Sequence, residues 1–221
     1  MRAAAFVAAV LLLAAPARAQ VSLDFNLGPT VNWTEDVSAF TFDPADPTTV
    51  FDRDSIDVPV TVGVQGGLGL TVRRGALGVR LGGQFLNTAA IYDGEERFNR
   101  QALEASFVTL QLDLQYARSL GPVGVVVFGG PEARYLLDLS GELAGVEDVR
   151  DGLDLLSAAA TVGAGLRLDL GGTRLGPQVR YAFDLTGVGG DDLAVDSGTA
   201  FRLDEAFDVH TLLVGIVLGG P

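Results

Sequence analysis

The chain has 221 residues, no cysteine and a formal net charge of −13, and 48% of its residues are hydrophobic. This length fits one domain, and the lack of cysteine excludes both disulfides and a lipoprotein anchor on an N-terminal cysteine. The acidic balance argues against a nucleic-acid partner, whose phosphates would be repelled.

The first 19 residues predict a cleaved secretory signal peptide. An apolar run from Ala3 to Ala15 follows a single Arg, and small residues stand at Ala17 and Ala19, the two positions that a signal peptidase recognises. The run is too short for a transmembrane helix. We therefore predict a signal peptide over 1–19 and one domain over 20–221, in which 13 Arg stand against 28 acidic residues.

Apolar and polar residues alternate at period two in eight segments, which predicts eight β-strands. In chain order the predicted strands cover 22–34, 58–72, 76–91, 108–117, 123–139, 166–170, 175–185 and 210–218. Several of the alternating runs last about nine to thirteen residues, long enough for a tilted strand to cross the hydrocarbon layer of a bilayer. Ordinary globular strands average about five to six residues. Strand length therefore favours a membrane protein.

The predicted connections differ in length in a regular way. Long connections lie near 35–57, 93–104, 141–154 and 187–205, and short turns lie near 73–75, 119–122 and 171–173. Long loops on one side, short turns on the other and an even strand count are typical of bacterial outer-membrane barrels. The long connection at 35–57 contains Pro44 and Pro47 together with seven acidic residues, so we predict an irregular loop there.

The polar face of the strands carries both charges and glycine, which favours the interior of a narrow barrel. Glycine weakens exposed strands, whereas in an eight-stranded barrel it leaves room for long side chains. We predict a network of charge pairs in the lumen because buried charges must be paired. Its members are Arg80, Asp113, Glu132, Arg134, Arg167, Asp169, Arg180 and Asp184. Aromatic residues near strand ends, including Trp33, Tyr116 and Tyr181, agree with interfacial girdles.

The predicted fold is all-β: an eight-stranded antiparallel up-and-down transmembrane β-barrel with short periplasmic turns and long acidic extracellular loops. Two stretches carry a resemblance to a known family. VTLQLDLQYARSLGPVGVVVFGGPEARYLLDLSGE and VGAGLRLDLGGTRLGPQVRYAFDLTGV resemble the PorT-like outer-membrane β-barrel family, most strongly from Val108 to Val188. The resemblance implies an eight-stranded barrel of the OmpA or OmpX size class without an open pore.

The predicted long loops hold 21 of the 28 acidic residues, so one rim of the barrel is strongly negative. Carboxylates attract divalent cations, which prefer oxygen ligands, and the Gly- and Asp-rich segment GVGGDDLAVDSG supplies the weak candidates Asp191, Asp192 and Asp196 for Ca²⁺ or Mg²⁺. The simpler interpretation is a solvated, salt-adapted surface. We favour this simpler interpretation over a metal site.

His210 is the only histidine, which excludes a metal site built from several histidines. Asp208 lies two residues away, but this spacing occurs in any strand and no recognisable motif places a serine nearby. Nucleotide-binding and hydrolase motifs are also absent from the sequence. We therefore predict no enzymatic activity and no cofactor.

These features predict an outer-membrane β-barrel protein with a structural, adhesion or envelope-complex role. The predicted partners are membrane lipid and lipopolysaccharide, with divalent cations at the acidic loops and an envelope protein as further candidates, and no nucleic acid. The main alternative is an exported soluble β-barrel that binds a small apolar ligand in its lumen. A narrow channel is a third hypothesis.

Overall fold

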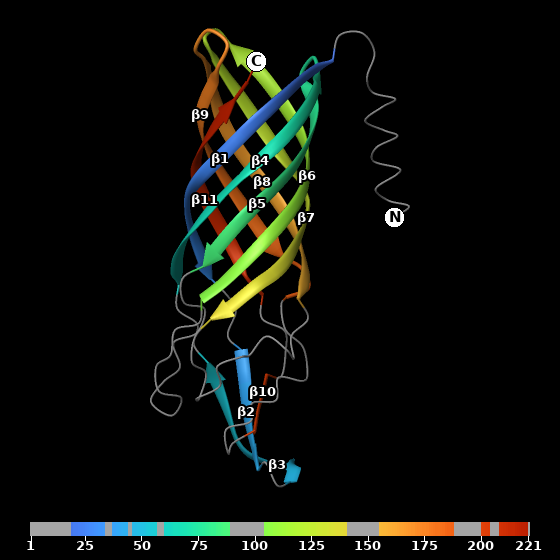
Figure 1. Cartoon of the computed structure of the whole chain (residues 1–221), viewed down its shortest axis with the longest axis vertical. Helices are drawn as coiled ribbons and strands as arrows, with labels where there is room; N and C mark the ends of the chain where they lie inside the picture. Colours follow the sequence, from blue (N-terminus) through green and yellow to red (C-terminus); the bar gives the residue numbers. More distant parts are fainter. Residues whose placement is uncertain are drawn as a thin grey trace.

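A computed structural model describes residues 19–33, 37–43, 46–56, 60–88, 104–140, 155–187, 200–203 and 208–220. Eight strands form a closed barrel in the order β1-β4-β5-β6-β7-β8-β9-β11, with β11 paired to β1 and every neighbouring pair antiparallel (Figure 1). They are β1 (Gln20–Trp33), β4 (Thr61–Arg74), β5 (Leu77–Thr88), β6 (Glu104–Leu120), β7 (Val123–Ser140), β8 (Leu156–Asp169), β9 (Arg174–Asp184) and β11 (His210–Gly219). The predicted eight-stranded up-and-down barrel is confirmed. No helix among the described residues is long and apolar enough to span a membrane.

The strands are long because the alternation continues without a break. β6 has 17 residues and β7 has 18, whereas a transmembrane strand needs about 9–11. The prediction was too short for β8, which begins at Leu156 rather than at residue 166. Its first ten residues, LSAAATVGAG, place small side chains on both faces, so the contrast between the two faces is weak in the sequence.

Three short turns lie together at one end of the barrel, called here the turn end (Figure 1). Gly75 and Gly121 have φ of 61° and 70°, a region that residues with a Cβ rarely adopt, and they allow the chain to reverse within two residues. β1 starts and β11 finishes at this same end (Figure 1). The long connections leave from the opposite end, called here the loop end.

Two of the predicted long loops contain regular structure that the sequence did not reveal. β2 (Val37–Asp43), β3 (Asp46–Ile56) and β10 (Ala200–Leu203) form a separate antiparallel sheet in the order β10-β2-β3, beyond the loop end of the barrel (Figure 1). The prediction of irregular loops over 35–57 and 187–205 was therefore wrong for these segments. Pro47 was one reason to predict a loop, because proline lacks a backbone N–H. It lies in β3, which is an edge strand, where a missing N–H is tolerated.

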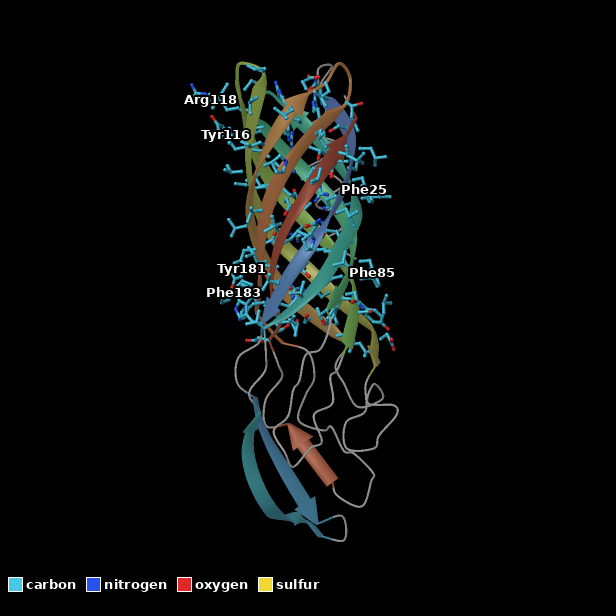
Figure 2. The ribbon with its side chains drawn as sticks, turned by 90° about the vertical axis from the view of Figure 1, so that its left-hand side faces the viewer. Phe25, Phe85, Tyr116, Arg118, Tyr181 and Phe183 are labelled. Carbon is cyan, nitrogen blue, oxygen red and sulfur yellow. The ribbon has the colours of Figure 1, made fainter. Side chains whose placement is uncertain are left out.

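The barrel turns its apolar face outward and its polar face inward (Figure 2). Leu110, Leu114 and Val162 are each about 60% exposed, at 58%, 64% and 61%, while inward-facing neighbours on the same strands are buried, among them Gln111, Asp113 and Thr161. Figure 2 shows Phe25 and Tyr116 on the outer surface towards the turn end, and Phe85, Tyr181 and Phe183 towards the loop end. This outer surface of exposed apolar side chains is far larger than a soluble monomer usually shows.

Candidate functional site

The lumen is the candidate site, because it concentrates nearly all of the buried charge that the structure describes. Four layers of inward-facing side chains follow one another from the loop end to the turn end. The first layer is apolar: Leu86 and Phe107 are paired across β5 and β6, Phe107 and Leu136 across β6 and β7, and all three are at most 1% exposed. This apolar layer lies next to the loop end.

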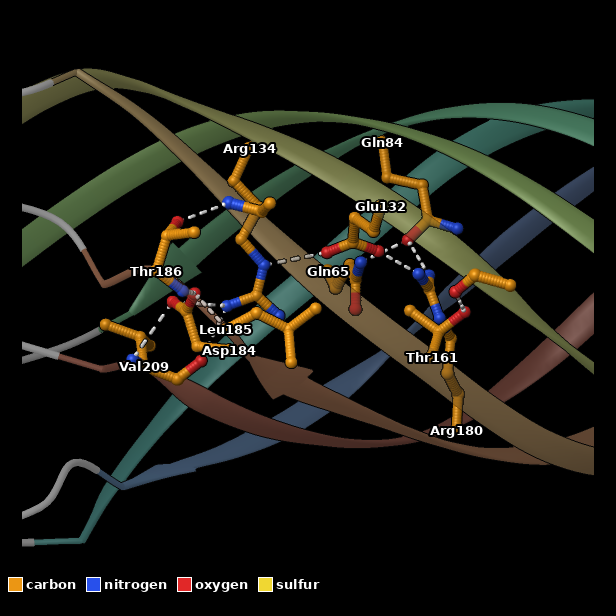
Figure 3. A network of polar contacts seen from close by, with 12 residues as sticks. Gln65, Gln84, Glu132, Arg134, Thr161, Arg180, Asp184, Leu185, Thr186 and Val209 are labelled. Carbon is orange, nitrogen blue, oxygen red and sulfur yellow. Dashed lines mark hydrogen bonds and ion pairs between the residues drawn. The ribbon is translucent and has the colours of Figure 1, made fainter.

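The second layer is an ion network centred on Glu132 (Figure 3). Arg134 donates its Nε–H to Glu132 Oε1 at 2.8 Å, and Arg180 pairs with Glu132 Oε2. Arg180 also donates to Gln84 Oε1 at 2.7 Å. The groups come from β7, from β9, which is separated from β7 only by β8, and from β5, which lies opposite β9 in the ring of strands. One carboxylate therefore holds two arginines that are 0% and 2% exposed.

Asp184 connects this network to the base of the loop-end connections (Figure 3). Its Oδ1 accepts backbone N–H groups of Leu185, Thr186 and Gly187 at 2.9–3.4 Å, and its Oδ2 accepts the N–H of Val209 at 3.2 Å. The same Oδ2 lies 3.6 Å from Arg134 Nη1. Through these hydrogen bonds Asp184 fixes the chain where it leaves β9 and where it enters β11.

The third layer is a second ion cluster nearer the turn end. Arg80 lies between two carboxylates, with Nη2 at 2.6 Å from Asp24 Oδ1 and Nη1 at 3.5 Å from Asp113 Oδ2. Thr71 donates to Asp24 Oδ2 at 3.0 Å, and Thr161 donates to Asp113 Oδ1 at 3.2 Å. Both carboxylates are buried and each has a charged and a neutral partner.

The fourth layer, at the turn end, has a different character. Arg73 and Arg167 each donate an Nη2–H to the same acceptor, Gln115 Oε1, at 3.2 Å. Within the described part of the chain, neither guanidinium forms an ion pair with a carboxylate. The second and third layers pair their arginines with carboxylates. The arginines of this fourth layer have no such partner.

Glycine on the inward face makes room for these long side chains, as the sequence pattern predicts. A Cβ at Gly69 would collide with the guanidinium of Arg80, and one at Gly82 would lie 2.6 Å from Gln111 Nε2. Real Cβ atoms essentially never come this close to a neighbour. The inward glycines therefore leave the space that Arg80 and Gln111 occupy in this lumen.

The structure brings together six of the eight residues predicted for the lumen network: Arg80, Asp113, Glu132, Arg134, Arg180 and Asp184. Arg167 is in the lumen but contacts Gln115 instead of an acid. Asp169 lies on the inward register of β8 but at its last residue, where it is exposed at the mouth. The missed member is Asp24, which the alternation of β1 already placed on the polar face.

His210 is packed into an aromatic cluster on the outer side of the barrel near the loop end. Its ring centroid lies 4.9 Å from that of Phe183, 6.1 Å from that of Trp33 and 6.3 Å from that of Tyr181. Trp33 and Tyr181 are stacked at 5.6 Å. The cluster joins β1, β11 and β9 through large rings, as in an interfacial girdle.

The weak metal candidates Asp191, Asp192 and Asp196 lie outside the described residues. Among the residues that the structure does describe, no three His, Cys, Asp or Glu side chains are grouped so as to hold a metal ion. The buried carboxylates of the lumen already have arginine partners, so the interior is organised around ion pairs.

A closed antiparallel barrel with an apolar exterior and a charge-paired polar interior belongs to the transmembrane class of β-barrels. No family model and no curated protein matches the chain. The solved structures with similar folds include Neisserial surface protein A (NspA), with 11% sequence identity, a TM-score of 0.45, and coverage of 91% of this chain and 98% of that chain. They also include the outer membrane protease OmpT from Escherichia coli, with 10% identity, a TM-score of 0.43, and coverage of 90% and 96%.

Proposed function

We propose that this chain is an outer-membrane protein of a Gram-negative bacterium that spans the membrane as a closed barrel, with its turn end in the periplasm and its acidic connections outside. Its role is structural or interactive, in envelope integrity, adhesion or an envelope complex, and not catalytic. The proposal includes the cleaved signal peptide over 1–19 and membership of the PorT-like family.

The observation that carries the proposal is the distribution of polarity across the barrel wall. Leucine, valine and aromatic side chains cover the outside, while Arg134, Glu132 and Asp113 are almost completely buried inside. In water this arrangement would expose the apolar surface to solvent and desolvate the charges. In a bilayer both faces match their surroundings, because lipid covers the outside and the ion pairs satisfy one another.

The composition of the lumen argues against both alternatives. A soluble carrier of an apolar ligand needs an apolar cavity, and the described lumen is instead crossed by two ion clusters and the apolar layer of Leu86, Phe107 and Leu136. The interior of an eight-stranded barrel is only just wide enough for side chains, which argues against a channel. We propose the loop-end connections as the part that contacts partners outside the cell.

The acidic connections favour interaction outside the cell. They carry most of the acidic residues of the sequence, and negative surfaces attract divalent cations, which bridge to lipopolysaccharide phosphates. We propose lipid and lipopolysaccharide as the surroundings of the barrel wall, and divalent cations and an envelope protein as partners of the connections.

Gel mobility of the outer-membrane fraction in SDS, with and without boiling, tests this proposal. A closed barrel resists SDS, so the unboiled band should run faster and shift on heating. A protein found in the soluble periplasmic fraction with no heat shift would contradict the proposal. Planar-bilayer recordings test the channel hypothesis. We expect a barrel without an open pore to give no conductance steps above the bare bilayer.

A further inference from the structure

The mouth of the barrel at the turn end forms a cavity of about 320 Å³, within the size range of ligand pockets. Its lining residues include four arginines and one acidic residue, Asp169. The arginines are Arg73, Arg118, Arg167 and Arg174. They come from β4, β6, β8 and β9, so the barrel closure brings together charges that are up to 101 positions apart in the sequence. One of the four arginines, Arg118, is exposed, and Figure 2 shows it on the outer side of the rim. We call this cavity the arginine mouth.

The arginine mouth has more hydrogen-bond donors than acceptors. A guanidinium carries five N–H donors, whereas an amide oxygen offers two lone pairs. Gln115 Oε1 already accepts from both Arg73 and Arg167, at 3.2 Å each, so it has no further capacity. Arg73 Nε is buried and has no hydrogen-bond partner. Several donors of two converging guanidinium groups are therefore unused.

The arginines of the mouth also form no ion pair with a carboxylate of the described residues. Asp24, the nearest buried carboxylate, is bound by Arg80 and Thr71. Asp169 lies at the rim, is exposed, and forms no ion pair with Arg73, Arg167 or Arg174. Elsewhere in the same lumen every described buried arginine has a carboxylate partner. Partly buried arginines that have spare donors and no carboxylate partner can bind an oxyanion.

We propose that the arginine mouth binds a phosphate group. The planar fork of a guanidinium matches the oxygens of a phosphate, and two such forks that converge on one point can hold it from two sides. Two sources of this chemistry meet a periplasmic mouth: a free phosphate or phosphorylated solute, and the headgroup of an inner-leaflet phospholipid. This site is independent of the role proposed for the acidic connections.

The first test measures binding of inorganic phosphate to the refolded barrel in a non-ionic detergent, by calorimetric titration and by broadening of the ³¹P resonance. The variant Arg73→Gln/Arg167→Gln removes both converging guanidinium groups. Arg74→Gln is the matched control, because Arg74 is adjacent in β4 but exposed and not part of the cavity lining. We expect wild type and Arg74→Gln to bind equally, and the double variant to bind at least tenfold more weakly.

The second test distinguishes the two sources of the phosphate. Protein taken from vesicles of phosphatidylglycerol and phosphatidylcholine is examined by native mass spectrometry for retained lipid. Retention of phosphatidylglycerol by wild type and Arg74→Gln, but not by the double variant, supports the site with a lipid headgroup as its ligand. Phosphate binding without lipid retention supports the site with a soluble ligand.

Two outcomes overturn the proposal. In one, wild type binds neither phosphate nor phospholipid, a result that needs no variant. In the other, the double variant binds either probe as tightly as wild type while its heat-modifiable mobility shows a folded barrel. If the double variant does not fold, Arg174→Gln replaces it; we expect a smaller loss of affinity, and unchanged affinity would count against the site.

Discussion

The two ends of the lumen differ in how their charges are treated, although the same alternating strands build both. Towards the loop end, Glu132 is shared by Arg134 and Arg180, and Asp184 lies 3.6 Å from Arg134. At the turn end, Arg73 and Arg167 share one neutral amide oxygen. The arginines towards the loop end have carboxylate partners, whereas Arg73 and Arg167 at the turn end have none among the described residues.

This difference separates charges that hold the fold from charges that are available to a ligand. A buried ion pair leaves an uncompensated charge in a low-dielectric interior when one partner is removed. An unpaired arginine at a mouth has no such partner to lose. Substitutions at the two ends should therefore have opposite consequences: loss of stability at the loop end and loss of binding at the turn end.

The largest effect is expected for Glu132→Ala. It leaves Arg134 and Arg180 without their shared carboxylate, and breaking a buried pair in this way costs about 3–5 kcal/mol. Urea unfolding of the refolded barrel measures the loss. Asp169→Asn is the control, because Asp169 is exposed and unpaired with the mouth arginines, and it should change the free energy of unfolding by less than about 0.5 kcal/mol. Equal effects of the two variants would erase the contrast between paired and unpaired charges.

A charge on the outer wall should cost slightly less. Leu110 is 58% exposed in the middle part of β6, so Leu110→Arg introduces a charge into the hydrocarbon layer at about 2–4 kcal/mol. Leu120, 59% exposed at the end of the same strand, reaches the interface, and Leu120→Arg should cost only about 0–1 kcal/mol. Both are measured by unfolding from vesicles. A soluble barrel would tolerate both substitutions alike.

The close approach of β6 and β7 predicts an intermediate effect at Gly130. A Cβ there would overlap the backbone carbonyl oxygen of Leu112, which cannot move away easily, so Gly130→Ala should destabilise the barrel by about 1–3 kcal/mol. Gly83→Ala is the matched variant, since the nearest atom to its Cβ, Thr109 O, is 4.0 Å away. Thermal loss of the fast-migrating gel band compares the two. The same midpoint for both would contradict the close approach.

The smallest effect on stability is expected for Arg167→Gln. This substitution removes an unpaired charge next to Arg73 and keeps a side chain that can donate to Gln115, so the free energy of unfolding should change by no more than about 0.5 kcal/mol. The measurement is again urea unfolding in detergent without phosphate. A loss as large as that of Glu132→Ala would mean that the arginine mouth is part of the structural network.

Period-two alternation explains why so much of the barrel could be predicted from the sequence. Alternation assigns each residue to a face, and the register of neighbouring strands then brings inward charges such as Arg80 and Asp113 together. The pairing of Arg80 with Asp24 could not be predicted, because it depends on which side chains cross the lumen rather than on the face that each one occupies. The start of β8 was missed because its Ala-rich sequence gives little contrast between the two faces. The strand β3 was missed because Pro47 is a residue type that disfavours strands.

The fluorescence of Trp33 tests the outward orientation of the apolar face most directly. It is the only tryptophan of the chain, it lies on the outward register at the end of β1, and it stacks on Tyr181 of the aromatic cluster. The barrel is refolded into vesicles whose phospholipid chains carry bromine at shallow or deep positions. We expect bromine to quench Trp33 emission, and more strongly from shallow than from deep positions. Emission that is the same in brominated and unbrominated vesicles would contradict a lipid-facing apolar wall.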